Sequence, residues 1–162
     1  MTAAVAEVLG RVVGLQRSGG GVPKMAVERV RVLLTGMEGD WQRDRRFHGG
    51  PDRALCLYSM ELIDALMAEG HPIAPGTVGE NVTIAGIDWR TMQPGARLTI
   101  GTASVELTDF AAPCRTIRES FVDERFKRIS EKLYPGWSRV YARVTKEGEI
   151  GVGDAVRVIP SS

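Results

Sequence analysis

Short runs in which apolar and polar residues alternate recur along the chain, and they indicate strands. In residues 103–108, Val105 and Leu107 alternate with Ser104 and Glu106, the period of a half-buried strand. Similar β-type runs cover residues 5–15, 25–34, 54–58, 81–86, 96–101, 139–145 and 155–159. Glycine and proline clusters separate several of these runs, as tight turns do. About eight short strands of this kind predict a mostly β fold, built as a closed or nearly closed antiparallel barrel.

Residues 59–70 have the longer period of an amphipathic helix. Leu62, Ile63, Leu66 and Met67 form one apolar face. Ser59 is suited to the N-cap, Glu61 to the first turn and Gly70 to the exit.

A second helix is predicted over residues 116–133. Thr116 is followed by Glu119, which is the spacing of a capping box. Val122, Phe126, Ile129 and Leu133 then recur at steps of four, three and four, which predicts a buried stripe. The expected fold is therefore a barrel with two or more α-helices packed outside it.

The composition narrows the class of protein. Apolar residues make up 43% and charged residues 25% of the 162 residues, which is typical of a globular domain, and the length fits a single domain over residues 1–162. A net charge of +1 does not indicate the basic surface that general nucleic-acid binding requires. No apolar run approaches the ~20 residues that cross a bilayer, and no signal peptide precedes the first strand. We expect a cytoplasmic protein that binds neither nucleic acid nor membranes.

Cys114 lies directly before the second predicted helix. Pro113 stiffens its approach, and Arg115 and Arg118 add positive charge near the expected helix start. These surroundings favour the thiolate form, which could serve as a metal ligand, a nucleophile or a persulfide carrier. The alternative is a small buried hydrophobe. That interpretation fits Cys56, which lies between two leucines in residues 54–58.

A zinc site or a cysteine protease has less support. The two cysteines and two histidines have no paired spacing of the zinc type. His48 is available as a partner for Cys114, but no local signature supports that pair.

Charged residues crowd the stretch 36–59, around the turn HGGP. They are Asp40, Arg43, Asp44, Arg45, Arg46, His48, Asp52 and Arg53. One histidine among several guanidinium groups suits a phosphorylated or anionic ligand, although a solvated loop has a similar composition.

Glu80 and Asn81 lie at a predicted turn-to-strand boundary. Lys24 ends a glycine-rich segment that could be an anion-binding loop or an ordinary turn.

Read in order, the motifs VPK, HGGPDRA, VGEN and PC, followed by VGDAVRV, resemble the MOSC domain. The match covers residues 5–159. MOSC domains occur at the C-terminus of molybdenum-cofactor sulfurases and as stand-alone bacterial proteins. The resemblance implies a MOSC-like β-barrel and a pyranopterin molybdenum cofactor with Cys114 as the metal ligand. The pyridoxal-phosphate domain of the sulfurases has no counterpart here, so pyridoxal phosphate is only an association of the family.

The resemblance suggests roles for further residues. Arg43, Arg45, Arg53, Arg115 and Lys24 would bind the pterin phosphate. Asn81 and His48 would orient an oxo ligand or pass a proton.

Two functions remain open. The first is a reductase of N-hydroxylated compounds such as hydroxylamino-purines and amidoximes, which would receive electrons from a separate redox protein. The second is a non-catalytic carrier of the cofactor or of persulfide sulfur. A barrel with a reactive cysteine and no molybdenum is a third possibility.

Overall fold

The alternating segments form strands. The computed structural model describes residues 8–18, 24–40 and 50–160. Its strands are β1 (Val8–Arg17), β2 (Met25–Val27), β3 (Arg29–Leu33), β4 (Gly36–Met37), β5 (Leu55–Ser59), β6 (Val82–Ala85), β7 (Arg97–Ile100), β8 (Ala103–Phe110), β9 (Val140–Lys146), β10 (Gly148–Gly151) and β11 (Ala155–Ile159). Each predicted run overlaps at least one of them, while the short β4 and β10 were not predicted.

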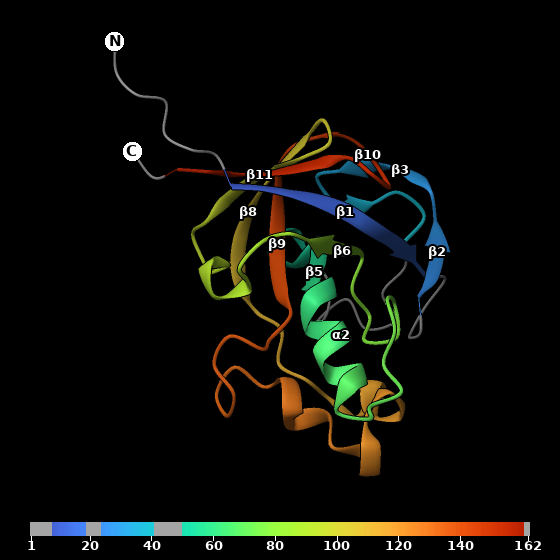
Figure 1. Ribbon diagram of the computed structural model, residues 1–162. Helices are drawn as coiled ribbons and strands as arrows, with labels where there is room; N and C mark the ends of the chain where they lie inside the picture. The colour runs from blue at the N-terminus through green and yellow to red at the C-terminus, as the bar shows by residue number, and fades with distance from the viewer. Residues whose placement is uncertain (1–7, 19–23, 41–49, 161–162) are drawn as a thin grey trace.

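Seven of the described strands close into a barrel. Their order is β11, β7, β8, β9, β5, β6 and β1, and β1 also pairs with β11. The two closing strands lie side by side in Figure 1. β2 extends the sheet beyond β1, and β10, β3 and β4 form a separate three-stranded sheet. The predicted mostly β fold, built around a barrel, is confirmed.

One strand pair departs from the antiparallel expectation. β5 and β6 are parallel, while the other pairs in the barrel are antiparallel. Parallel neighbours need a crossover connection. Here it contains the α-helix α2 (Met60–Ala68), which follows β5 directly and lies against the barrel (Figure 1).

The predicted capping of α2 is confirmed. The Ser59 hydroxyl accepts a hydrogen bond from Leu62 N at 3.2 Å, and Gly70 follows the helix with a φ of +98°. Ile63 and Leu66 are fully buried, whereas Met67 is about half exposed. The apolar face is therefore narrower than the pattern predicted.

The second predicted helix is wrong. Residues 116–133 contain 3-10 helices rather than an α-helix, namely η3 (Arg115–Ser120), η4 (Val122–Glu124) and η5 (Phe126–Ile129). Two more 3-10 helices, η1 (Pro51–Arg53) and η2 (Trp89–Thr91), lie elsewhere. Only Ile129 of the expected stripe is fully buried, and Val122 and Leu133 are exposed.

Contacts with the 71–77 segment explain the difference. His71 Nδ1 accepts a hydrogen bond from Val122 N at 3.0 Å, and Ser120 donates to Thr77 O at 3.2 Å. The Phe121 ring packs edge-on against His71. These contacts require a turn at 121–124 that an α-helix cannot make, so tertiary packing overrides the local pattern.

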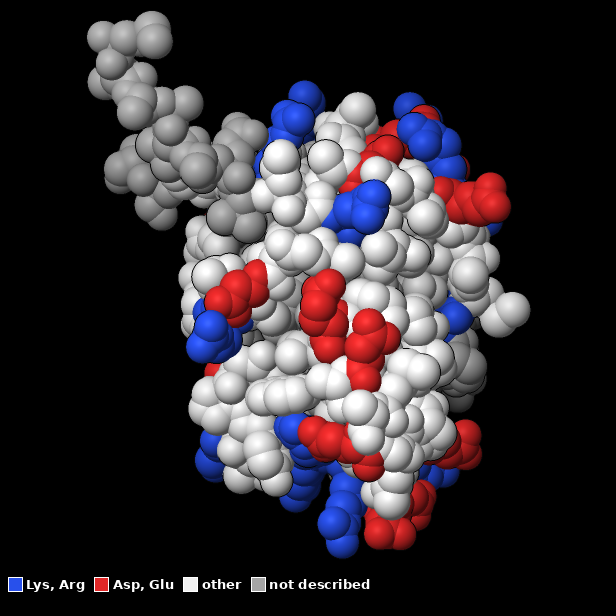
Figure 2. Space-filling model, in the orientation of Figure 1, with Lys and Arg blue, Asp and Glu red and all other residues white. Residues whose placement is uncertain are grey.

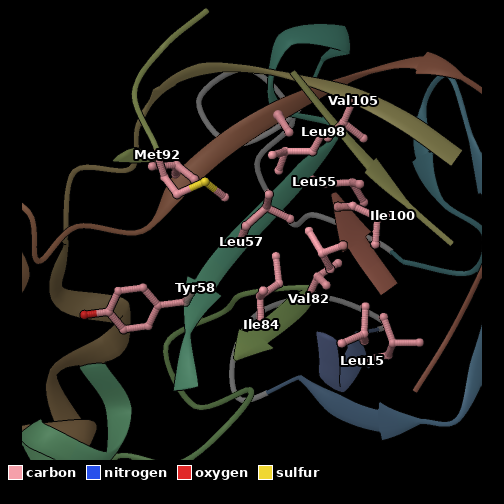
Figure 3. Packing of buried hydrophobic residues seen from close by; sticks show 14 of the residues in the cluster. Leu15, Leu55, Leu57, Tyr58, Val82, Ile84, Met92, Leu98, Ile100 and Val105 are labelled. Atoms are coloured by element: carbon pink, nitrogen blue, oxygen red, sulfur yellow. The ribbon is translucent and has the colours of Figure 1, made fainter. Parts of the chain in front are cut away.

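The barrel interior is filled by side chains from its strands. Figure 3 shows this packing around Leu57 of β5 and Val82 of β6, with Leu98 and Ile100 of β7 on the other side. All four are at most 1% exposed. The barrel is a packed core, so a ligand site must lie at its ends or on its surface.

The surface carries both signs of charge. Acidic and basic side chains are interspersed on the face in Figure 2. Within the described ranges, no helix has the length and apolar character needed to span a membrane.

Candidate functional site

Cys114 lies on a loop that leaves β8 and enters η3. It is the N-cap of η3, so Thr116 does not hold that position as predicted. Cys114 is half-buried, and its Sγ atom lies 2.9 Å from Thr116 Oγ1. The sulfur is therefore reachable from solvent and held by a local contact.

The expected cationic surroundings are only partly present. The guanidinium of Arg118 donates to Arg115 O and pairs with Glu124 at 3.1 Å. Arg115 itself is exposed. A single short 3-10 helix also gives a weaker positive end than the long helix that the sequence predicted.

Cys56 lies in the core, as predicted. It is 4% exposed and packs in a small cluster with Ala111 and Tyr141. Burial raises the pKa of its thiol. Both cysteines are free thiols, so they form no disulfide with each other. Cys56 is buried, whereas Cys114 is half-buried.

Tyr141 connects several candidate residues. The guanidinium of Arg53 lies 5.0 Å from the centre of the Tyr141 ring. The pKa of Tyr141 is raised, mainly by burial. Cys56 and Cys114 raise it further, while Arg139 and Arg53 lower it.

Lys24 and Asn81 meet at a different point, through Asp40. Lys24 Nζ lies 2.8 Å from Asp40 Oδ2, and Asn81 Nδ2 donates to the same oxygen at 3.0 Å. Ser18 N donates to Asp40 Oδ1. The Lys24 and Asp40 side chains are 6% and 5% exposed, so this is a buried ion pair with further hydrogen bonds.

The Asn81 amide is fully engaged. Its Oδ1 accepts from Cys56 N at 2.9 Å, and its Nδ2 also approaches Gln16 O. The amide therefore ties β5 and β1 to Asp40. These hydrogen bonds give Asn81 a structural role, because they hold β1, β5 and Asp40 together.

Glu80 is fully buried beside this network. Its Oε2 accepts from Thr83 at 3.1 Å, while Oε1 has no hydrogen-bond partner among the described residues. Burial raises its pKa to about 7, against the effect of backbone donors at Gly76 and Glu80. The group therefore holds a proton over a range where an exposed glutamate is ionised.

Arg139 is the residue that sequence reasoning missed. It is 7% exposed and donates to the carbonyl oxygens of Val78, Ala111 and Ala112. It begins an apolar run, where an arginine is ordinarily assumed to be exposed. Asp40 carried a signal, since it belongs to the charged stretch 36–59, but its burial could not be predicted.

Three of the predicted site residues, Arg43, Arg45 and His48, lie outside the described residues. A cavity of about 490 Å³ is lined by residues that include Met37, Asp40, Gly50 and Ala54. Another, of about 550 Å³, lies at His71 and η4–η5 and is lined by none of the predicted site residues that the structure describes. Because Asp40 lines the first cavity, a ligand there would be next to the Lys24–Asp40 pair.

The donor set suits a metal that arrives with most of its own ligands. Over residues 8–18, 24–40 and 50–160, no three His, Cys, Asp or Glu side chains gather as a metal cage. Cys114 is a half-buried free thiol on a loop, and it could supply the one soft protein ligand that such a metal needs.

Comparison with known proteins gives the family. The model of the MOSC domain matches residues 44–157. YflK of Bacillus subtilis (strain 168) is 30% identical over 132 residues, covering 79% of this chain and 58% of that protein. The Escherichia coli (strain K12) protein YiiM is 33% identical over 108 residues, covering 59% of this chain and 47% of that protein. The chain spans about half the length of these relatives.

Solved structures share the fold. The crystal structure of YiiM from Escherichia coli superposes with a TM-score of 0.69 at 21% identity, covering 94% of this chain and 71% of that one. The YUAD protein from Bacillus subtilis gives a TM-score of 0.74 at 19% identity, covering 97% and 99%. The family match extends over more than half of the chain, and it includes Cys114, Asn81 and Arg139. The chain belongs to the MOSC domain family.

Proposed function

We propose that this protein binds a molybdenum cofactor through Cys114 and reduces N-hydroxylated compounds. The observation that carries the proposal is the placement of Cys114 in a MOSC domain. It is a half-buried residue on a loop, whereas Cys56 is buried in the core. Thiolate is a donor that softer metal centres prefer.

The described cations would share the binding of the cofactor phosphate. Arg115 is exposed, and Arg53 stands over the Tyr141 ring, so both can turn a guanidinium toward an anion. Lys24 is already paired with Asp40, so its contribution would be to hold Asp40 in place at the edge of the cavity. Arg43 and Arg45 complete the proposed set.

Reduction of an N–OH group to N–H consumes two electrons and two protons and releases water. When bound, the cofactor supplies the electrons through its metal, which a separate redox protein would reduce again. The proton donor would be His48, because the Asn81 amide is committed to Cys56, Gln16 and Asp40. Asn81 would fix the geometry of the site.

The decisive experiment is metal analysis of protein expressed with molybdate. We expect molybdenum to co-purify with the unaltered chain and with Cys56→Ala, and to fall by about tenfold or more in Cys114→Ser, because a ligand is lost. Molybdenum bound equally by all three proteins, or by none, would refute the assignment.

Activity then separates the enzyme from the carrier. Loaded protein should convert a hydroxylamino-purine or an amidoxime with an artificial electron donor, and Cys114→Ser should not. Loaded protein without turnover toward either substrate would favour the carrier function.

A further inference from the structure

Arg139 is 7% exposed, and its side-chain hydrogen bonds within the described residues go to backbone carbonyl oxygens. Its charge lowers the pKa of buried Glu80, but it forms no ion pair with a carboxylate of the described residues. Burying a guanidinium without a counter-ion costs several kcal/mol unless hydrogen bonds replace the lost water. The hydrogen bonds to three backbone carbonyl oxygens offset part of this cost.

Those hydrogen bonds join two loops. Nη1 donates to Val78 O at 2.7 Å, in the loop that ends at Glu80 and Asn81. Nη2 approaches Ala111 O and Ala112 O, both at 3.4 Å, in the loop that carries Cys114.

The backbone strengthens the second attachment. Ala111 N donates to Arg139 O at 2.9 Å, and the neighbouring Ser138 hydroxyl lies 3.3 Å from Ala111 O. The Cys114 loop is thus held at its base by both the main chain and the side chains of Ser138 and Arg139, the two residues before β9. The planar, forked guanidinium can reach both loops at once, whereas an ammonium group is a single point donor.

We infer that Arg139 is a positioning residue for Cys114. It ties the 111–114 loop to the 78–81 loop, so that the sulfur keeps a fixed place relative to the Lys24–Asp40–Asn81 network. This rests on the proposed function in taking Cys114 as the reactive group. The hydrogen bonds that carry it are independent of any cofactor.

A probe on the sulfur itself tests the inference. A trifluoromethyl group is attached to Cys114 with bromotrifluoroacetone in the full chain carrying Cys56→Ala, and its fluorine NMR signal is recorded. We expect one narrow resonance with Arg139 present. Arg139→Met and Arg139→Lys should each broaden or split it, since neither side chain can bond both loops.

Val144→Ala is the matched control. It shortens a buried side chain of β9, the strand that begins directly after Arg139, and it lies in neither loop. Its melting temperature should fall while its fluorine signal stays narrow. If Val144→Ala broadens the signal as much as Arg139→Lys at equal loss of stability, or if Arg139→Lys leaves the signal narrow, the inference is wrong.

If neither Arg139 variant folds, the inference is also wrong, because Arg139 would then be required for the stability of the whole barrel and not specifically for the position of Cys114. The probe needs no molybdenum, so its outcome is separate from that of the metal analysis.

Discussion

At the scale of single residues, the two cysteines differ through their surroundings. Cys56 lies under Ala111 and Tyr141 at 4% exposure, while Cys114 is half-buried on a loop. The leucines around Cys56 in the sequence predicted its burial. For Cys114 the sequence predicted a position before a long helix, where the structure instead has the short 3-10 helix η3.

Thiol labelling of the native protein follows from this contrast. Iodoacetamide should modify Cys114 in the folded state and Cys56 only after unfolding, because burial both blocks Cys56 and raises its pKa. Mass spectrometry of peptides before and after denaturant measures this. Equal labelling of both residues in the native protein would contradict the structure.

Glu80 gives a pH dependence of stability. Its folded pKa is about 7 and its ordinary value is 4.5, so the folded state binds the extra proton between these values. The free energy of unfolding should therefore fall as pH rises from about 4.5 to about 7, by roughly 3 kcal/mol in total. Glu80→Gln should flatten this dependence in urea titrations. Glu106→Gln, at a partly exposed position of β8, should leave it unchanged.

At the scale of elements, strands were more predictable than helices. Alternation such as that of β8 depends on neighbours two residues apart and survives in the fold. The break between η3 and η5 depends on His71 and Thr77, which are distant in sequence. No glycine or proline interrupts residues 116–133, so the local pattern offered no sign of that break.

The turn at η4 holds Asp123 and Glu124 at φ values of +54° and +57°. A side chain in this conformation costs about 1 kcal/mol that glycine does not incur. Glu124→Gly should therefore stabilise the protein by about 0.5–1 kcal/mol in thermal or urea unfolding. Glu124→Ala is the control, since it removes the same exposed ion pair with Arg118 but keeps the strain. A stability of Glu124→Gly no higher than that of Glu124→Ala would argue against strain at this turn.

At the scale of the whole molecule, the alternating runs predicted a barrel but not its order. The parallel pairing of β5 with β6 depends on the path of the crossover that contains α2. The burial of Arg139 and the meeting of Lys24 with Asn81 through Asp40 depend on the same global arrangement. Local sequence could name candidate residues but could not say which of them would be neighbours.

Closure of the barrel is sensitive at Gly10, where β1 faces Val156 of β11. A Cβ there would lie 2.7 Å from Ala85 O and from Ile87 Cγ1. Gly10→Ala should destabilise the protein by about 1–3 kcal/mol, because backbone atoms must shift. Val13→Ala, at a partly exposed position of the same strand, should change the urea midpoint little. An equal midpoint for both variants would mean that β1 does not pack as described.

The pairing of β1 with β11 also has a consequence for how the protein is made. The first described strand cannot complete its hydrogen bonds until the last one has left the ribosome. Until then the nascent sheet exposes unpaired edges and an apolar lining, which are the features that recruit chaperones or lead to aggregation. Closure of the barrel should thus wait until β11 has been synthesised, and it should proceed at the slow rates that long-range strand pairing imposes.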